Sequence, residues 1–429
     1  MPVIVSSQHF DERGSEVGVC PQNSSFTRVF PKSECMSSRI LTWISAVAIV
    51  FGSNIWFSST ALARSYLYPE ARYVSPEGEA MSGITVPLTD EAGNNLMNNP
   101  AGLAKVSGYR AEPLNLSFQM NSNSVSNLTT SQLHSFSLGG LSSTMNQTAN
   151  NNVPFGVGLS NMTAFSWNGF GFGILLQELS RAQSDGTNVK TQVVSQMVPT
   201  AGYAFGLARN IIRIGYSLQF VNQTEGTATQ VSNSSATFLS GLTKGSGLSH
   251  NVSINFAFPF TYRPTLSFMV RNIGGVTYGS TSLMPRGTSI SGTPPNEPMT
   301  IDMAFDFMVR ITGTVKSHFY VQYEDFSSQA AIPNIFDRLK TGFDLQFSPS
   351  FVIRAGMTGL MQFSAGGVAQ FSFGAAFKGQ NSEIGLAYYN EPNPFGPAWD
   401  TRYALQYKIM LNQHAKKADK EMANVGNKQ

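Results

Sequence analysis

Between residues 113 and 411 the sequence alternates apolar and polar residues with a period of two, in segments of about 10–13 residues. The clearest segment is TRYALQYKIML at 401–411, in which Tyr403 and Leu405 share one face and Arg402 lies on the other. Half-buried strands produce this pattern, yet strands of soluble proteins are usually only about five or six residues long. Strands of about 9–11 residues, apolar outward and polar inward, are typical of transmembrane barrels.

About 14 such segments can be placed along the chain. Their connections alternate between very short ones and longer ones, as in barrels with short periplasmic turns and long extracellular loops. An even number of strands assigns the further segment 131–145 to the first extracellular loop. Because a sheet in lipid cannot leave edge groups unpaired, the sequence predicts an all-β fold, a closed transmembrane antiparallel β-barrel with strands at 113–123, 153–166, 169–181, 193–207, 210–223, 246–259, 264–272, 298–312, 315–326, 336–348, 350–358, 366–378, 381–390 and 401–411.

The composition agrees with a membrane protein better than with a nucleic-acid-binding one. Charged residues make up 12% of the 429 residues, about half of the usual share of roughly 25%. The net charge of +3 is small, and no long basic block is present, so we expect no nucleic-acid partner. Residues 412–429 are polar and charged, and we expect them to form a disordered periplasmic tail.

The first 63 residues carry the pattern of an exported protein. An apolar stretch at 40–57 follows Arg39, and small residues at 61–63 follow the stretch, which is the order of a secretory signal peptide. We expect 1–63 to be an N-terminal extension plus signal peptide, cleaved after Ala63, with Met36 as the alternative start and the bacterial outer membrane as the destination. The alternative is a membrane anchor, because about 18 residues nearly suffice to span a bilayer.

The segment TDEAGNNLMNNPAGLAKV at 89–106 does not read as a strand. Its apolar residues recur at helical intervals, and Pro100 interrupts it. A barrel of about 14 strands is too wide for its own side chains to fill, since about eight strands already give a filled interior. We therefore predict that 64–112 forms a partly helical plug, with Ala92, Leu96 and Leu103 against the inner wall and the asparagines bonded to polar side chains of the wall.

A signal peptide, a non-strand lead and about 14 strands together resemble the FadL-like superfamily of outer-membrane proteins, which includes transporters of long-chain fatty acids and aromatic hydrocarbons. NNPAGLA and the closing DTRYALQYKI are similar to a neighbouring branch that includes PorV-like shuttle proteins of secretion systems. The resemblance implies a barrel with an N-terminal hatch and a hydrophobic ligand inside. The hatch motif is carried here by Asp90, Glu91, Ala92, Gly93, Asn94, Asn99, Pro100 and Ala101.

No motif indicates catalysis, so we expect neither an enzyme nor a cofactor. His134, His250, His318 and His414 are scattered without the spacing of metal ligands, and Cys20 and Cys35 both precede the proposed cleavage site. The run GFGFG at 169–173 leads into a strand rather than a helix, so we interpret its glycines as making room in the lumen and not as a nucleotide loop.

Charged residues on the polar face of the segments are expected to line the lumen. They could neutralise one another around water, or some of the cations could hold an acyl carboxylate or anchor the plug. Since both signs are present, no anion-selective pore is indicated. The residues are Arg213, Asp302, Asp306, Arg310, Lys316, Glu324, Arg338, Lys340, Asp344, Arg354 and Arg402.

The leading functional hypothesis is passive uptake of hydrophobic, fatty-acid-like small molecules across the outer membrane. The alternative is a PorV-like scaffold or shuttle that does not transport. Outer-membrane lipid is the expected partner in both cases, joined by a hydrophobic ligand in the first and a secreted or surface protein in the second. A narrow apolar pocket would favour transport, and a salt-bridged lumen with a fixed plug would favour the scaffold. The loop at 273–297 is either a lid or a plain surface loop.

Overall fold

A computed structural model describes residues 73–122, 124, 155–184, 188–231, 242–283, 292–311, 315–326, 338–358, 370–392 and 399–413. The expected signal peptide, its cleavage site, the segment 131–145 and residues 414–429 of the polar tail lie outside these ranges. Within these ranges no helix is long and apolar enough to cross a membrane.

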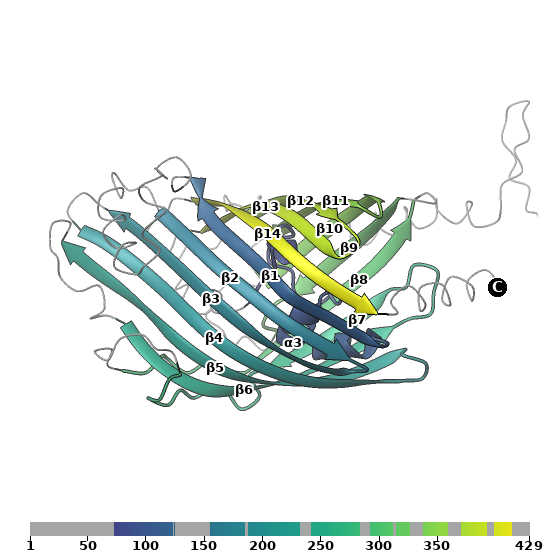
Figure 1. The fold of residues 1–429 in the computed structure, drawn as a ribbon, viewed down its shortest axis with the longest axis horizontal. Helices are drawn as coiled ribbons and strands as arrows, with labels where there is room; N and C mark the ends of the chain where they lie inside the picture. The colour runs from purple at the N-terminus through teal and green to yellow at the C-terminus, as the bar shows by residue number, and fades with distance from the viewer. Residues whose placement is uncertain are drawn as a thin grey trace, which may run out of the picture. The chain divides into compact units, whose positions relative to one another are not determined.

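The strands close into one antiparallel barrel in which β1 pairs with β14 and every other strand pairs with its neighbours in the sequence (Figure 1). The predicted closed barrel and its number of strands are confirmed. The strands are β1 (Tyr109–Asn121), β2 (Phe155–Trp167), β3 (Phe170–Ser184), β4 (Asn188–Leu207), β5 (Ile212–Val231), β6 (Leu242–Ala257), β7 (Thr265–Arg271), β8 (Thr300–Arg310), β9 (Lys316–Tyr323), β10 (Leu339–Ser348), β11 (Phe351–Thr358), β12 (Gln370–Lys378), β13 (Ser382–Pro392) and β14 (Trp399–Gln413).

Side chains alternate between the two faces of the wall along β14. Arg402 and Gln406 face the interior and are each 1% exposed, whereas Leu405 is 52% exposed on the outer face. Phe319 on β9 and Phe343 on β10 are likewise exposed and face each other across the strand pair. An apolar outer face around a polar interior is the arrangement of a barrel that spans a membrane.

Several strand ends differ from the sequence-based prediction. β1 begins at Tyr109 rather than 113, and its pairing with β14 shifts register around Pro113, because proline has no N–H to donate to the ladder. β4 and β5 have 20 residues each and extend into the segments predicted as loops, 182–192 and 224–245. At about 3.3 Å per residue such strands outrun the hydrocarbon core of roughly 30 Å, so their outer ends do not need the apolar face on which the prediction relied.

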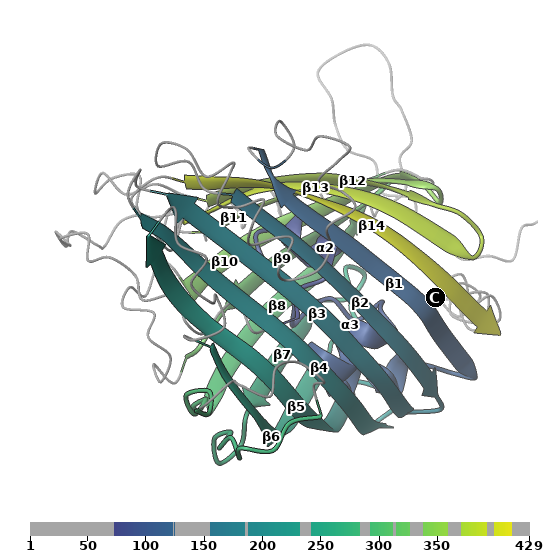
Figure 2. The same cartoon turned by 60° about the vertical axis from the view of Figure 1, so that its left-hand side comes forward.

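Residues 73–108, called the plug, lie inside the ring of strands, as Figure 2 shows for α2 and α3. α2 (Pro76–Glu79) begins after Ser75, whose Oγ accepts a hydrogen bond from the N–H of Gly78 at 3.3 Å. α3 (Ala92–Asn98) is followed by the 3-10 helix η2 (Pro100–Lys105). Pro100 lacks an N–H and suits only a first helical position, so the predicted partly helical plug with a break at Pro100 is confirmed.

The apolar core lies between the plug and the wall strands β2 to β5. Leu96 and Leu103 are fully buried there against Met162 and Leu175 of the wall. Gly171, the second glycine of the GFGFG run, faces the same two leucines, and a Cβ at this position would lie 3.0 Å from Leu103. Burying each leucine contributes about 1.5–3 kcal/mol, so the wall glycine makes space for contacts that hold the plug.

The plug asparagines follow the predicted bonding to the wall only in part: Asn98 Oδ1 accepts from Arg271 Nη1 of β7 at 2.9 Å, but the amide nitrogens bond within the plug. Asn99 Nδ2 donates to the carbonyl oxygen of Val86 at 2.7 Å, and Asn95 Nδ2 donates to that of Thr89 at 3.1 Å. Asn94 and Asn98 also donate to plug carbonyls. The segment before α3 has little regular structure, and its backbone carbonyls need donors when buried. The asparagine amide nitrogens therefore join the plug to itself.

Two inward-facing glycines let the plug backbone touch the wall. A Cβ on Gly215 of β5 would overlap the backbone of Pro100 and Ala101. A Cβ on Gly356 of β11 would overlap the backbone of Met81. Because these contacts involve backbone atoms, a neighbouring side chain cannot simply rotate away.

We expect Leu405→Arg to destabilise the barrel by about 2–4 kcal/mol, because it puts a charge on the lipid-facing wall. Urea unfolding of the protein in lipid vesicles measures this change. Leu405→Met is the matched control and should change the free energy of unfolding by less than about 1.5 kcal/mol. Equal effects of the two substitutions would contradict a lipid-facing position for Leu405.

We expect Gly215→Ala to displace η2 from the wall, because the new methyl group has no free space beside Pro100 and Ala101. Faster proteolysis of the plug, with the barrel intact, is the readout. Gly385→Ala is the control, since the nearest atom to its Cβ would be the side-chain oxygen of Gln406 at 3.3 Å. Unchanged proteolysis in Gly215→Ala would rule out the backbone contact.

Candidate functional site: the plug, its anchors and an internal cavity

The N-terminus of α3 meets a carboxylate of the wall. Glu112 on β1 accepts hydrogen bonds from the backbone N–H of Ala92 at 2.8 Å and from that of Gly93 at 3.1 Å. Free N–H groups and the positive end of the helix dipole favour an anion at this position. Arg110 Nε lies 3.1 Å from the same carboxylate. Ala92 and Gly93 of the predicted hatch motif therefore bind the wall through their backbone.

A chain of buried ion pairs connects both plug helices to one side of the wall. Lys408 Nζ on β14 lies 2.6 Å from Glu91 and 3.0 Å from Glu383 on β13. Arg354 on β11 lies 3.2 Å from Glu383 and 3.1 Å from Glu77 of α2. We call these five residues the anchor network. Removing one partner of a buried pair costs about 3–5 kcal/mol, because the other charge stays buried without compensation.

The anchor network contains three carboxylates and two cations, so it carries one excess negative charge. Burial by itself would raise the pKa of Glu77, but the nearby cations, Arg354 first and then Lys378 and Lys408, together outweigh burial and hold the pKa below its usual value. Burial raises the pKa of Glu91, and Lys408 offsets this only in part. Glu91 Oε2 has no hydrogen-bond partner among the described residues. Glu91 is therefore the plug carboxylate that most readily takes up a proton.

Neutral wall side chains add further anchors to the plug. Gln322 Oε1 on β9 accepts from the backbone N–H of both Thr85 and Val86 at 2.9 Å. Ser253 Oγ on β6 accepts from the N–H of Ala101 at 2.7 Å. Ser82 and Ser372 on β12 bring their hydroxyl oxygens to 2.9 Å. The plug is thus hydrogen-bonded to strands β6, β9 and β12, which lie well apart around the barrel.

Most of the other charges predicted to line the lumen are paired. Lys340 Nζ lies 2.8 Å from Glu324 and donates to the carbonyl oxygen of Gly83 at 3.1 Å. The remaining pairs are Arg338 with Asp325 at 3.7 Å, Arg402 with Asp400 at 2.9 Å, Arg271 with Asp302 at 2.6 Å and Asp344 with the hydroxyl of Tyr320 at 2.8 Å.

The cations near the short turns are not gathered with the others. Arg213 Nε donates to the carbonyl oxygen of Asn210 at 3.2 Å. Arg310 is exposed and Lys316 half-buried, and Asp90 of the hatch motif is exposed as well. These residues therefore do not join the anchor network.

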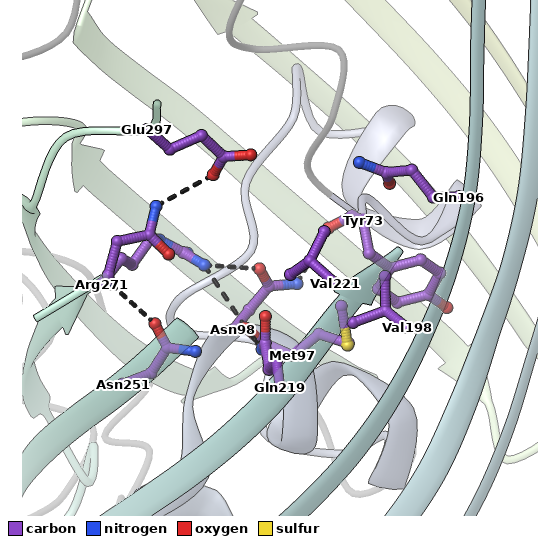
Figure 3. A pocket seen from close by; sticks show the side chains of 11 residues that line it. Tyr73, Met97, Asn98, Gln196, Val198, Gln219, Val221, Asn251, Arg271 and Glu297 are labelled. Atoms are coloured by element: carbon purple, nitrogen blue, oxygen red, sulfur yellow. Dashed lines mark hydrogen bonds between the residues drawn. The ribbon is translucent and has the colours of Figure 1, made fainter. Parts of the chain in front are cut away.

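A cavity of about 50 Å³ lies between α3, the wall strands β4 to β7 and the loop that follows β7 (Figure 3). This volume holds roughly three to five water molecules, at about 10–15 Å³ for each. Figure 3 shows Arg271, Asn251 and Glu297 on one side of the cavity and Tyr73 and Val198 on the other. The cavity is lined by Tyr73, Met97, Asn98, Gln196, Val198, Gln219, Val221, Asn251, Arg271, Asn272 and Glu297.

The described parts of the loop between β7 and β8, residues 272–283 and 292–299, are called the inner loop. Val276 and Tyr278 are buried and belong to the same apolar core as the plug. Gly279 exchanges two backbone hydrogen bonds with Ser246 of β6. The inner loop therefore folds against β6, and its Asn272 and Glu297 line the cavity.

Sequence reasoning missed several residues of this site. Lys408 was placed on the polar face of its strand, but its pairing with Glu91 and Glu383 depends on a register that the sequence does not reveal. Glu112 was placed in the plug, although its position just before Pro113 could have suggested a bulge. Glu297 and Arg271 carry no local signal, since only the fold brings both of them to the lining of one cavity.

Across the described residues no group of histidine, cysteine, aspartate or glutamate side chains has the geometry to hold a metal ion. The charged groups of the site form ion pairs and hydrogen bonds that join the plug to the wall.

No protein-family model matches the sequence, and no curated protein matches it. Solved structures do: the toluene transporter TodX of Pseudomonas putida is 11% identical, with 80% of this chain and 100% of that chain covered and a TM-score of 0.45. The toluene transporter TbuX of Ralstonia pickettii is 11% identical, with 81% of this chain and 100% of that chain covered and a TM-score of 0.45. A FadL homologue of Pseudomonas aeruginosa is 12% identical, with 79% of this chain and 97% of that chain covered and a TM-score of 0.42.

We expect Lys408→Met to loosen the plug, because it leaves Glu91 and Glu383 buried without their shared cation. The expected weakening is about 3–5 kcal/mol. A higher ion conductance of the purified protein in planar bilayers is the readout.

Lys316→Met is the control, since Lys316 is half-buried and forms no ion pair within the described residues. Its conductance should match the wild type. A Lys408→Met barrel that conducts no better than Lys316→Met would show that the anchor network does not hold the plug.

Proposed function

We propose that the chain is an outer-membrane channel in which the plug gates the passive uptake of small molecules with an apolar part. Export by a signal peptide within residues 1–63 and extracellular placement of the long connections are parts of this proposal. The observation that carries it is the cavity between α3, the wall and the inner loop. Tyr73, Met97 and Asn98 of the plug line this cavity, so a molecule bound there would contact the gate directly.

The cavity has the two-sided lining that an amphipathic cargo needs. Met97, Val198 and Val221 offer apolar contact, and Arg271 and Glu297 face them with charge. Pockets for small molecules are usually about 300–1,000 Å³, so the cavity of about 50 Å³ is a closed state. Cargo larger than a few atoms therefore requires the inner loop or the plug to move.

Internal hydrogen bonds would keep the plug together as one body during a displacement. Within the plug, four side chains donate hydrogen bonds to backbone carbonyls, those of Asn94, Asn95, Asn98 and Asn99. The anchor network and the neutral side chains of the wall hold the plug from outside. Breaking the wall contacts would leave the internal hydrogen bonds in place. Uptake would then consist of capture in the cavity, release of the anchors and passage beside the displaced plug.

One observation favours the second candidate, a PorV-like scaffold that does not transport. The anchor network fixes both plug helices to the wall through buried ion pairs, and a plug that never moves needs such fixation. In that case the lumen would be a rigid support for extracellular loops that hold a secreted or surface protein.

A reversible lock between plug and wall separates the two candidates. Ser82 and Ser372 have hydroxyl oxygens 2.9 Å apart, so the double variant Ser82→Cys/Ser372→Cys should form a disulfide with an S–S length near 2.05 Å. We expect the oxidised double variant to lose uptake by cells of labelled amphipathic molecules, measured with a fatty acid and an alkylamine in parallel, and to regain it on reduction. The reason is that the disulfide tethers the plug to β12.

The two single cysteine variants, treated with the same oxidant and reductant, are the controls and should take up the label in both states. Uptake that is unchanged by oxidation of the double variant would contradict a moving plug. Co-purification of a stoichiometric protein partner with that locked barrel would then favour the scaffold.

A further inference from the structure

The chemistry of the cavity constrains its cargo further, and this inference rests on the proposed function. Glu297 of the inner loop lines the cavity and is half-buried. Its carboxylate accepts hydrogen bonds from the hydroxyl of Tyr278 and from Asn272 Nδ2, the latter at 3.0 Å. Within the described residues it forms no ion pair. Two neutral donors thus hold the Glu297 carboxylate at the edge of the cavity.

Arg271, the cation in the cavity lining, is already bonded to residues outside the cavity and to the plug. Arg271 Nε lies 2.6 Å from Asp302, and Arg271 Nη1 donates to Asn98 Oδ1 at 2.9 Å. The guanidinium therefore bonds to both the wall and the plug, and Asp302 balances its charge. The ionised groups of the lining plus Asp302 sum to one negative charge, which belongs to Glu297.

The amide groups of the lining also leave one fully buried acceptor open. Gln219 Nε2 donates to the carbonyl oxygen of Met97 at 3.1 Å, and Gln196 Nε2 donates to Gln223 at 2.6 Å. Gln196 is 3% exposed, and its Oε1 has no partner among the described residues. Asn251 Nδ2 is the one lining amide donor without a partner there. A buried acceptor without a donor costs about 1–3 kcal/mol, so a donor-bearing cargo would relieve it.

A cationic donor fits this lining and a carboxylate does not. An ammonium group beside Glu297 would form a charge-assisted hydrogen bond, while its alkyl part would face Val198 and Val221. An acyl carboxylate in the same place would meet Glu297 as a like charge, with Arg271 already neutralised. We propose that this cavity is a binding site for small alkylammonium groups, so that the cargo is an amine-bearing amphipathic molecule and not a fatty acid.

The test compares two probes of nearly equal size, ethylammonium and acetate, on the full purified chain in detergent. Ligand-observed saturation-transfer NMR gives the dissociation constant of each probe. We expect ethylammonium to bind at least about tenfold more tightly than acetate, which is the effect of one hydrogen bond to a charged group. Glu297→Gln should remove this preference. Equal binding of both probes, or tighter binding of acetate, would overturn the proposal.

Asp306→Asn is the matched control. Asp306 is also half-buried and lies on β8, where it pairs with Thr265; six residues of β7 separate Thr265 from Arg271, roughly 20 Å along the strand. The control should keep the preference for ethylammonium. A preference lost equally in both variants would point to the overall charge of the lumen and overturn the site. Failure here leaves the disulfide lock unaffected, because the lock reports on plug movement whatever the cargo.

Discussion

A sheet surrounded by lipid has no water to satisfy the backbone groups of an edge strand, so it has to close. In this chain β1 meets β14 and closes the sheet. The closed wall encloses a lumen wider than its own side chains can fill, and that width is the origin of the plug. Every further feature of the site follows from attaching a plug to a polar inner wall: the glycine contacts, the anchor network and the cavity that remains.

The plug solves two problems with different residues. Apolar contacts of Leu96 and Leu103 supply the burial, while asparagine side chains satisfy the backbone carbonyls of a segment with little regular structure. Charged anchors then fix its position in the barrel. Because buried ion pairs add little stability over an apolar core but are costly to break singly, we interpret the anchor network as setting the position of the plug more than the stability of the barrel.

The fold was largely predictable because a strand between lipid and a polar lumen alternates apolar and polar residues with a period of two. Leu405 must face outward if Arg402 faces inward, so the sequence of β14 assigns each of its side chains to one face of the wall. The same rule explains the errors, since the outer ends of β4 and β5 reach beyond the lipid and lose the pattern. Glu91 and Pro100 could be assigned to the plug from a short motif. Their partners Lys408 and Gly215 could not, because these contacts depend on how strands distant in the sequence surround the plug.

Native-state hydrogen exchange of the full chain in detergent measures most directly whether the plug is one preassembled body held by the wall. The amides of Thr85, Val86, Ala92 and Ala101 are bonded to wall side chains. We expect them to exchange together, with one opening free energy that lies below that of the strands. Exchange at unrelated rates, residue by residue, or without protection, would contradict a plug that is held and released as a unit.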